Sequence, residues 1–255
     1  MLKQESASLL KIIYEDEEIL VVNKQAGLVC HPTRQGPDSS LIGRLRLYLG
    51  EGSHPQMVNR LDRETSGIII VAKTVQSALM IRKIWEKQRV LKEYLAIVHG
   101  FVKKNSDTIN APLGKDVNST VAIKDWVRPD GLPATTYFRV LTRFEKDGNK
   151  FSLLKVIPKT GKKHQIRIHL SYIGYPVVGD KIYGGDETIY LNYYLKRNLT
   201  PEHQAQLILP YQALHSSRVK FSMKARIYDF FAEPEDWFKN FINTMSLSEI
   251  PGYLD

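Results

Sequence analysis

One polar segment, Asn59–Thr74 with the sequence NRLDRETSGIIIVAKT, carries a carboxylate in a setting suited to chemistry. Asp62 lies between Arg60 and Arg63, and Gly67 follows shortly before an apolar run. The two guanidinium groups would hold the Asp62 carboxylate ionised and would attract phosphates. An ionised carboxylate at a sheet edge suits a nucleophile that acts on a polyanion. A solvated charged loop is the alternative interpretation, because short motifs also occur by chance.

The elements that must position this carboxylate are predicted from hydrophobic patterning. Two β-branched runs, Ile19–Asn23 and Ile68–Ala72, predict central strands buried on both faces of a sheet. Thr74 predicts the cap of an amphipathic helix that continues to about Gln88. Alternation over Lys92–Val98 predicts another strand. Asp62 is therefore expected just ahead of a buried strand.

The second half of the chain predicts further elements. A hairpin is expected for TTYFRVLTRF and FSLLKVIP, which flank a turn at residues 147–149. In KKHQIRIHL (162–170), alternation predicts a strand with an apolar face of Ile166, Ile168 and Leu170 and a polar face of Gln165, Arg167 and His169. Thr200 with Pro201 predicts a helix start, and EDWFKNFINTM (235–245) a closing amphipathic helix.

Strands and helices alternate irregularly, which favours an α+β fold over a doubly wound α/β fold. No repeat or low-complexity linker marks a boundary, so we expect one domain over residues 1–255 with a core at about 12–241.

Composition narrows the possible functions. The 255-residue chain has 36 Lys and Arg against 27 Asp and Glu, and its net charge of +9 favours a polyanionic partner through counterion release. Cys30 is the only cysteine, which excludes an internal disulfide and a cysteine-built zinc site. No stretch reaches the roughly 18 apolar residues of a membrane helix. A cytoplasmic protein without a membrane partner is expected.

Four ordered motifs resemble the RluA-type pseudouridine synthases. They are RLDRETSGIIIVAK (60–73), KEYLAIVHG (92–100), TGKKHQIRIHL with GYPVVGDKIYGG (160–170 and 174–185), and ALHSSRVKF (213–221). The resemblance extends from about Ile12 to Phe241. It implies the pseudouridine synthase fold: a central mixed, largely antiparallel sheet flanked by helices and loops, with an RNA-binding cleft.

The resemblance also implies a role for each matched residue. Asp62 would be the nucleophile, Tyr94 would stack on the flipped base or take part in proton transfer, and Arg167 would pair with Asp62 and contact RNA. Leu214 would help to wall the uracil pocket. The reaction breaks the N1–C1′ bond of a uridine and rejoins the base through C5, without cofactor or metal. Attack at C1′, attack at C6 and a glycal route all require an ionised carboxylate beside an extruded base.

The implied substrate is ribosomal RNA, tRNA or both. Cations near the motifs are the expected phosphate contacts: Arg60, Arg63, Lys73, Arg89, Lys92, Lys162 and Lys163. For each cation, a solvated surface charge is the alternative. A monomer would suffice for a single cleft.

Two departures from the family pattern concern RNA contacts. Asn59 stands where the family often has His, and Lys162 with Lys163 stands where Arg-Thr is usual. The residues ahead of the motifs are too few for the small S4-like domain of many relatives. A stand-alone catalytic domain is therefore expected.

Three other interpretations compete. A metal hydrolase could use His164, His169 and His215 with Asp180, but strand spacing would separate the first two histidines. A glycosidase would need a second carboxylate with a raised pKa beside Asp62, and none is identifiable. The strongest alternative is a non-catalytic RNA-binding or chaperone protein on the same scaffold, although binding alone requires no nucleophile at Asp62.

Overall fold

A computed structural model describes residues 9–32, 36–50, 52–196, 199–244 and 246–253. The chain divides into two compact units, each assembled from two separate stretches. The first unit comprises Met1–Lys92 and His215–Asp236, and the second comprises Glu93–Leu214 and Trp237–Asp255. Segments distant in sequence therefore build each unit.

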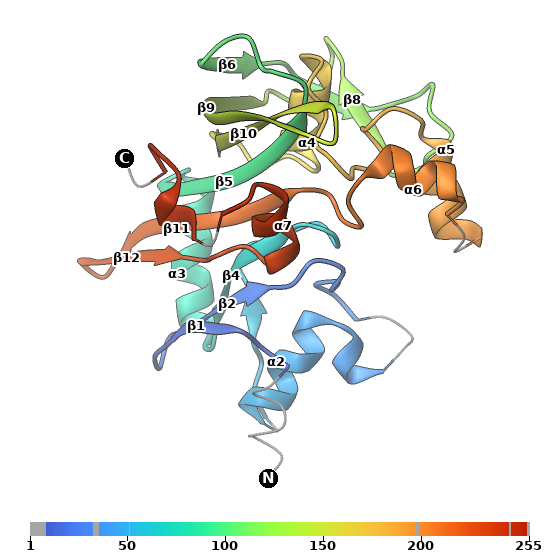
Figure 1. Ribbon diagram of the computed structural model, residues 1–255. Coiled ribbons are helices and arrows are strands. Elements are labelled where there is room, and N and C mark those ends of the chain that lie inside the picture. The colour runs from blue at the N-terminus through green and yellow to red at the C-terminus, as the bar shows by residue number, and fades with distance from the viewer. Residues whose placement is uncertain (1–8, 33–35, 51, 197–198, 245, 254–255) are drawn as a thin grey trace. The chain divides into compact units, whose positions relative to one another are not determined.

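The first unit contains a mixed sheet (Figure 1). Its strands follow the order β1 (Ile12–Glu15), β2 (Ile19–Lys24), β4 (Ser66–Ala72) and β11 (Leu214–Met223), with β12 (Arg226–Phe231) on β11 and β3 (Gln56–Met57) on β4. β4 and β11 are parallel, with His215 opposite Ser66, and the other pairs are antiparallel. The runs predicted as buried strands are confirmed as β2 and β4, every residue of which is buried.

Helix α3 (Val75–Glu86) covers this sheet, and the predicted cap is confirmed. Thr74 Oγ1 accepts a hydrogen bond from Ser77 N at 3.0 Å. Ala78 and Ile81 belong to the same buried cluster as Ile68 and other alternate residues of β4. The first unit also contains the short helix η1 (Pro37–Ser39) and helix α2 (Leu41–Leu49).

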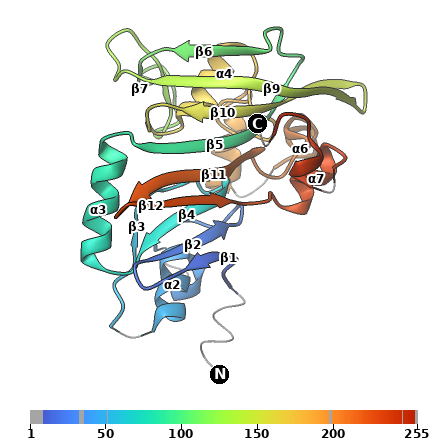
Figure 2. The ribbon, with the colours of Figure 1, turned by 90° about the vertical axis from the view of Figure 1, so that its left-hand side faces the viewer.

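The second unit contains an antiparallel sheet (Figure 2). Its strands follow the order β5 (Val90–His99), β10 (Asn149–Pro158), β9 (Thr135–Lys146) and β6 (Ser106–Asn110), and β7 (Leu113–Lys115) pairs separately with β8 (Asp125–Val127). The predicted hairpin is confirmed as β9 and β10, and the residues of its turn, Asp147 and Gly148, both have positive φ. Strands mixed irregularly with helices, and mostly antiparallel pairs, confirm the α+β class.

The remaining helices are short: α4 (Gln165–Tyr172), α5 (Thr188–Leu191), η2 (Asn192–Lys196), α6 (Pro201–Leu207), α7 (Asp236–Phe241) and η3 (Leu247–Glu249). Thr200 caps α6 as predicted, since its Oγ1 accepts from His203 N at 3.3 Å. The predicted closing helix forms as α7 but ends at Phe241, and η3 follows it. Met245, also within that prediction, lies outside the described residues.

The strand predicted over 162–170 is wrong, because residues 165–170 belong to helix α4 and residues 162–164 precede it. Its polar and apolar residues alternate, yet all of 165–170 are buried, so the alternation does not separate a wet face from a dry one. Gln165 Nε2 donates to Thr135 O and Thr136 Oγ1, and His169 bonds Thr136 Oγ1 and Ala111 O. Satisfied polar groups can be buried on every side of a helix, which hides its period.

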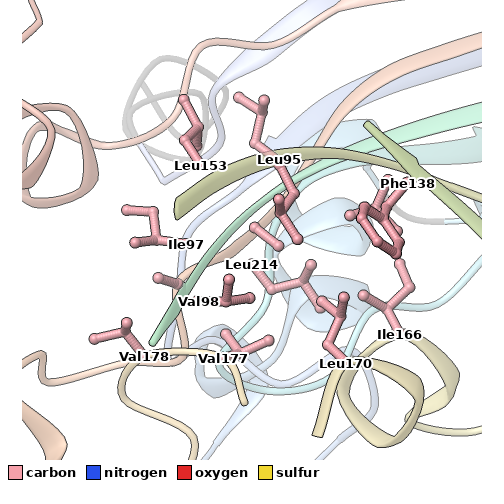
Figure 3. Close-up of a cluster of buried hydrophobic side chains, with 14 of the residues drawn as sticks. Leu95, Ile97, Val98, Phe138, Leu153, Ile166, Leu170, Val177, Val178 and Leu214 are labelled. Carbon is pink, nitrogen blue, oxygen red and sulfur yellow. The ribbon is translucent and has the colours of Figure 1, made fainter. Parts of the chain in front are cut away.

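The core of the second unit fixes α4 against the sheet. Figure 3 shows Ile166 and Leu170 of α4 near Phe138, in the same cluster as Ile97 and Leu214. All five side chains are buried. Because Ile166 and Leu170 are one helical turn apart, they anchor one side of α4 and set the rotation of the helix.

Candidate active site

The loop that carries Asp62 is fixed to β4 by Asn59. Asn59 Oδ1 accepts from Ile70 N at 2.8 Å, and Asn59 Nδ2 donates to Ile68 O at 3.0 Å. The side-chain amide thus acts as a short strand partner for β4. Asp62 O accepts from Thr65 N at 3.2 Å, which closes a turn directly before the strand. Asp62 itself is half-buried.

Lys24, at the end of β2, supports the same loop from within. Its Nζ donates to the carbonyl oxygens of Gln25 and Leu28, both at 2.9 Å, and of Arg63 at 3.0 Å. The residue is 1% exposed, and burial lowers the pKa of its ammonium group to about 8, against the raising effect of acidic neighbours that include Asp62. Three carbonyl partners use all three ammonium protons, so the backbone beside Asp62 is held by a buried cation.

Arg63 and Cys30 add further ties between this loop and the segment after β2. Arg63 Nε donates to Gly27 O at 3.1 Å, while Gly27 N donates to Arg63 O at 2.9 Å. Cys30 is buried, and its Sγ lies 3.4 Å from Leu61 O. The backbone on both sides of Asp62 is therefore pinned to a second segment.

Gly67 lies within β4 rather than ahead of it, and it permits the close approach of β11. Its φ is +113°, and a Cβ there would lie 2.3 Å from Ser216 O. One residue earlier, Ser66 Oγ bonds His215 Nδ1 at 2.8 Å, and His215 Nε2 bonds Ala232 O at 2.8 Å. The parallel pairing beside the Asp62 turn thus depends on a glycine and a buried histidine.

The cations predicted to bind RNA in the first unit do not gather in one place. Arg60 and Arg63 flank Asp62 and are exposed. Lys73 lies beyond the far end of β4, where its Nζ pairs with Glu15 at 2.7 Å. Arg89 lines a depression of about 440 Å³ beside Lys220. Lys220 lies towards the end of β11 that is farther from His215. Of these four cations, Arg60 and Arg63 lie beside the Asp62 turn.

In the second unit, Arg167 of α4 forms a two-pronged ion pair with Asp180. Arg167 Nε lies 2.6 Å from Asp180 Oδ2, and Nη2 lies 2.8 Å from Oδ1. Burial alone would raise the pKa of the Asp180 carboxyl, but the Arg167 charge and the hydrogen bonds to the carboxylate outweigh it, so this pKa lies below its ordinary value. Asp180 is therefore ionised near neutral pH.

The other predicted residues of the second unit surround the same core. Tyr94 on β5 is half-buried and packs on the cluster that contains Ile166 and Leu214. Leu214 is 4% exposed. Lys162 lies in the loop before α4, and Lys163 in that loop pairs with Asp125 at 2.9 Å. Tyr94, Leu214 and the helix of Arg167 are thus brought together within this unit.

Lys92, the last residue of the first unit, is half-buried at the start of β5, and burial lowers the pKa of its ammonium group.

The meeting of Asp62 with Tyr94, Arg167 and Leu214 stays a prediction, because Asp62 belongs to the first unit and the others to the second. Lys24 is not among the residues singled out from the sequence, and Asp180 is considered there only as a metal ligand. The sequence offers a signal for each: a lysine ends a buried run, and an aspartate follows Gly179 in a glycine-rich motif.

The histidines considered as metal ligands have other partners. His164 Nδ1 lies 2.9 Å from Tyr183 Oη, and His169 and His215 hold the contacts given above. Over the described ranges, no three His, Cys, Asp or Glu side chains are grouped to hold a metal ion. The same part of the chain contains no helix that is both long and apolar enough to cross a bilayer.

Comparison with known proteins defines the class. The structure named "Human RNA Pseudouridylate Synthase Domain Containing 1" matches with a TM-score of 0.71 and 25% identity, covering 91% of this chain and 85% of the human chain. The RNA pseudouridylate synthase family model matches residues 18–172. The chain belongs to this family, and its α+β fold is the pseudouridine synthase fold.

Two bacterial relatives extend the comparison. A Bacillus subtilis (strain 168) protein named "Uncharacterized RNA pseudouridine synthase YlyB" is 36% identical over 72% of this chain and 60% of its own length. The protein named ribosomal large subunit pseudouridine synthase D of Pseudomonas aeruginosa is 38% identical over 69% of this chain and 54% of its own length. The chain thus spans between half and two thirds of these relatives.

Proposed function

We propose that the protein is an RNA pseudouridine synthase that isomerises specific uridines in ribosomal RNA, with Asp62 as the catalytic carboxylate. The observation that carries the proposal is Asp62 itself, in a turn whose backbone is tied to β4 by Asn59 and to Lys24 through Arg63 O. Family membership and the names of the relatives support the reaction class. A tRNA substrate and a cytoplasmic location belong to the same proposal.

The reaction requires a base outside its stack and a fixed carboxylate beside it. The N1–C1′ bond breaks, the uracil rotates, and a C5–C1′ bond forms. C5 then loses its hydrogen as a proton, and N1 ends protonated, so the product is an isomer of the substrate and no redox partner is involved. A turn whose backbone is fixed around Asp62 suits this task, because positioning supplies much of the rate of such reactions.

The residues of the second unit take supporting roles in the proposal. Tyr94 would contact the flipped base, Leu214 would bound its pocket, and Arg167 would pair with Asp62. The net charge of +9 supports RNA as the partner, and exposed Arg60 and Arg63 are suited to contact phosphates next to the target nucleotide.

The test uses ribosomal RNA and tRNA transcripts that contain [5-³H]uridine. Formation of each C5–C1′ bond releases the tritium of that uridine. The wild-type protein is expected to release tritium from a small number of sites. Asp62→Asn keeps the shape of the side chain and removes the charge, and we expect activity to fall at least about 1,000-fold. RNA affinity in filter binding should stay within about threefold, because the phosphate contacts remain.

Glu64→Gln is the matched control, since it removes the other carboxylate of the same loop. It should release tritium at close to the wild-type rate. Wild-type protein that binds these RNAs but releases no tritium from any of them would favour the RNA-binding alternative.

A further inference from the structure

The Arg167–Asp180 pair is the most deeply buried two-pronged ion pair described in the second unit. The Arg167 side chain is 5% exposed and that of Asp180 is 0% exposed. The Arg167 guanidinium also lies over the Tyr183 ring, 5.0 Å from its centroid. Taking two charges out of water is costly, and apolar residues of similar volume often stabilise a core as well or better. A contribution to stability alone therefore explains this pair poorly.

Asp180 is itself held from several directions. Its Oδ1 accepts from Ile182 N at 2.9 Å and from Tyr183 N at 3.0 Å, and its backbone O accepts from Gly184 N at 3.1 Å. Hydrogen bonds within its own turn therefore fix the Asp180 carboxylate independently of Arg167.

Two glycines allow this turn to close. A Cβ on Gly184 would lie 2.4 Å from Asp180 O, and one on Gly179, whose φ is +78°, would lie 2.2 Å from Tyr211 O. The motif GYPVVGDKIYGG therefore builds a rigid seat for one carboxylate.

We infer that Asp180 is a positioning residue for the isomerisation, which aims the Arg167 guanidinium at the reacting site; the inference rests on the proposed function. A guanidinium is planar, so fixing its Nε–Nη2 edge fixes the direction of Nη1 as well. An arginine held in this way keeps its remaining N–H groups in one direction. Asp180 acts through Arg167 and needs no contact with RNA.

A second pair in the molecule provides a matched control. Arg218 and Asp229 of the first unit form the same fork, with Nε–Oδ1 and Nη2–Oδ2 distances of 2.8 Å each. Their side chains are 19% and 26% exposed, and neither residue has a role in the proposed site. Asp229→Asn removes an Arg–Asp fork without touching Arg167.

The experiment measures kcat and KM by tritium release on an RNA that the wild-type protein modifies. Asp180→Asn should lower kcat by about 10- to 100-fold and leave KM within about threefold, because misaimed groups slow the chemical step more than they weaken binding. Arg167→Lys should lower kcat similarly, and the double variant should be no slower than Arg167→Lys alone. Asp229→Asn should keep kcat within about twofold.

Folding is checked by circular dichroism and thermal unfolding, and rates are measured well below each unfolding midpoint. If Asp180→Asn does not fold, Asp180→Glu replaces it, since this variant keeps the buried charges balanced and moves the fork by one methylene. It should also lower kcat without raising KM.

Either folded variant with wild-type kcat would overturn the positioning role, even if its unfolding midpoint fell. Losses that multiply in the double variant would also overturn it, because independent effects add as free energies. A wild-type protein that releases no tritium would instead overturn the proposed function, and this inference with it.

Discussion

Three buried polar residues of this protein show how hydrogen-bond partners accompany burial. Lys24 places its ammonium among three carbonyl oxygens, Asp180 accepts from Arg167 and two backbone N–H groups, and His215 joins Ser66 to Ala232 O. Loss of any of these partners would leave a buried polar group unsatisfied and would lower the free energy of unfolding. Such residues hold backbone and side chains in one arrangement, and two of them support residues of the proposed site.

His215 makes stability depend on pH. Burial lowers the pKa of its imidazole from 6.5 to about 4, so the folded protein holds the neutral ring while the unfolded chain takes up a proton below pH 6.5. Stability is therefore complete above pH 6.5 and falls as the pH drops towards 4, by up to about 3 kcal/mol. Urea unfolding at pH 7.5 and pH 4.5 should show this loss.

The matched variant is His215→Asn, which should lose less stability than the wild type between the two pH values. The control His54→Asn alters an exposed histidine and should follow the wild type. Equal pH dependence of wild type and His215→Asn would contradict this assignment.

At the scale of elements, the sequence predicts the strands and helices that have a clear local signal. β2, β4, α3 and the β9–β10 hairpin follow from apolar runs, alternation, a cap and a turn. The sequence of α4 predicts a strand, because polar and apolar residues alternate along it. The helix tolerates this pattern because its polar residues form hydrogen bonds inside the protein. Local pattern carries no information about such distant partners.

The residues of the candidate site also differ in whether a local sequence signal identifies them. Asp62 is singled out by its neighbours in sequence, and its catalytic role stays a prediction. Asp180 lies 13 residues from Arg167, and Lys24 lies 39 residues from Arg63, so their contacts arise only from the fold.

The β4–β11 pairing yields a prediction at this scale. Gly67→Ala would place a methyl group 2.3 Å from Ser216 O at a φ of +113°, so it should cost on the order of 3–5 kcal/mol. Gly50→Ala has a φ of +88° and a ψ of 175°, with nothing within 4 Å, so only backbone strain of about 1–3 kcal/mol applies. Urea unfolding of both variants compares them, and equal losses would mean that the close approach to Ser216 has no energetic weight.

At the scale of the whole molecule, the proposed reaction draws on both units. Asp62 comes from the first unit, whereas Tyr94, Arg167 and Leu214 come from the second. Each unit is assembled from two stretches of chain, so segments far apart in sequence position the residues that have roles in the proposal. The net charge of +9 adds attraction to RNA that weakens as salt rises.

The most direct test is pseudouridine mapping of total RNA, by carbodiimide labelling and reverse transcription, from cells of the source organism that lack this protein. The cells are complemented with wild type, Asp62→Asn or nothing. We predict that one or a few ribosomal RNA sites disappear without the protein and return only with the wild type. Sites that return equally with Asp62→Asn, or a map that never changes while purified protein still binds RNA, would contradict catalysis by Asp62.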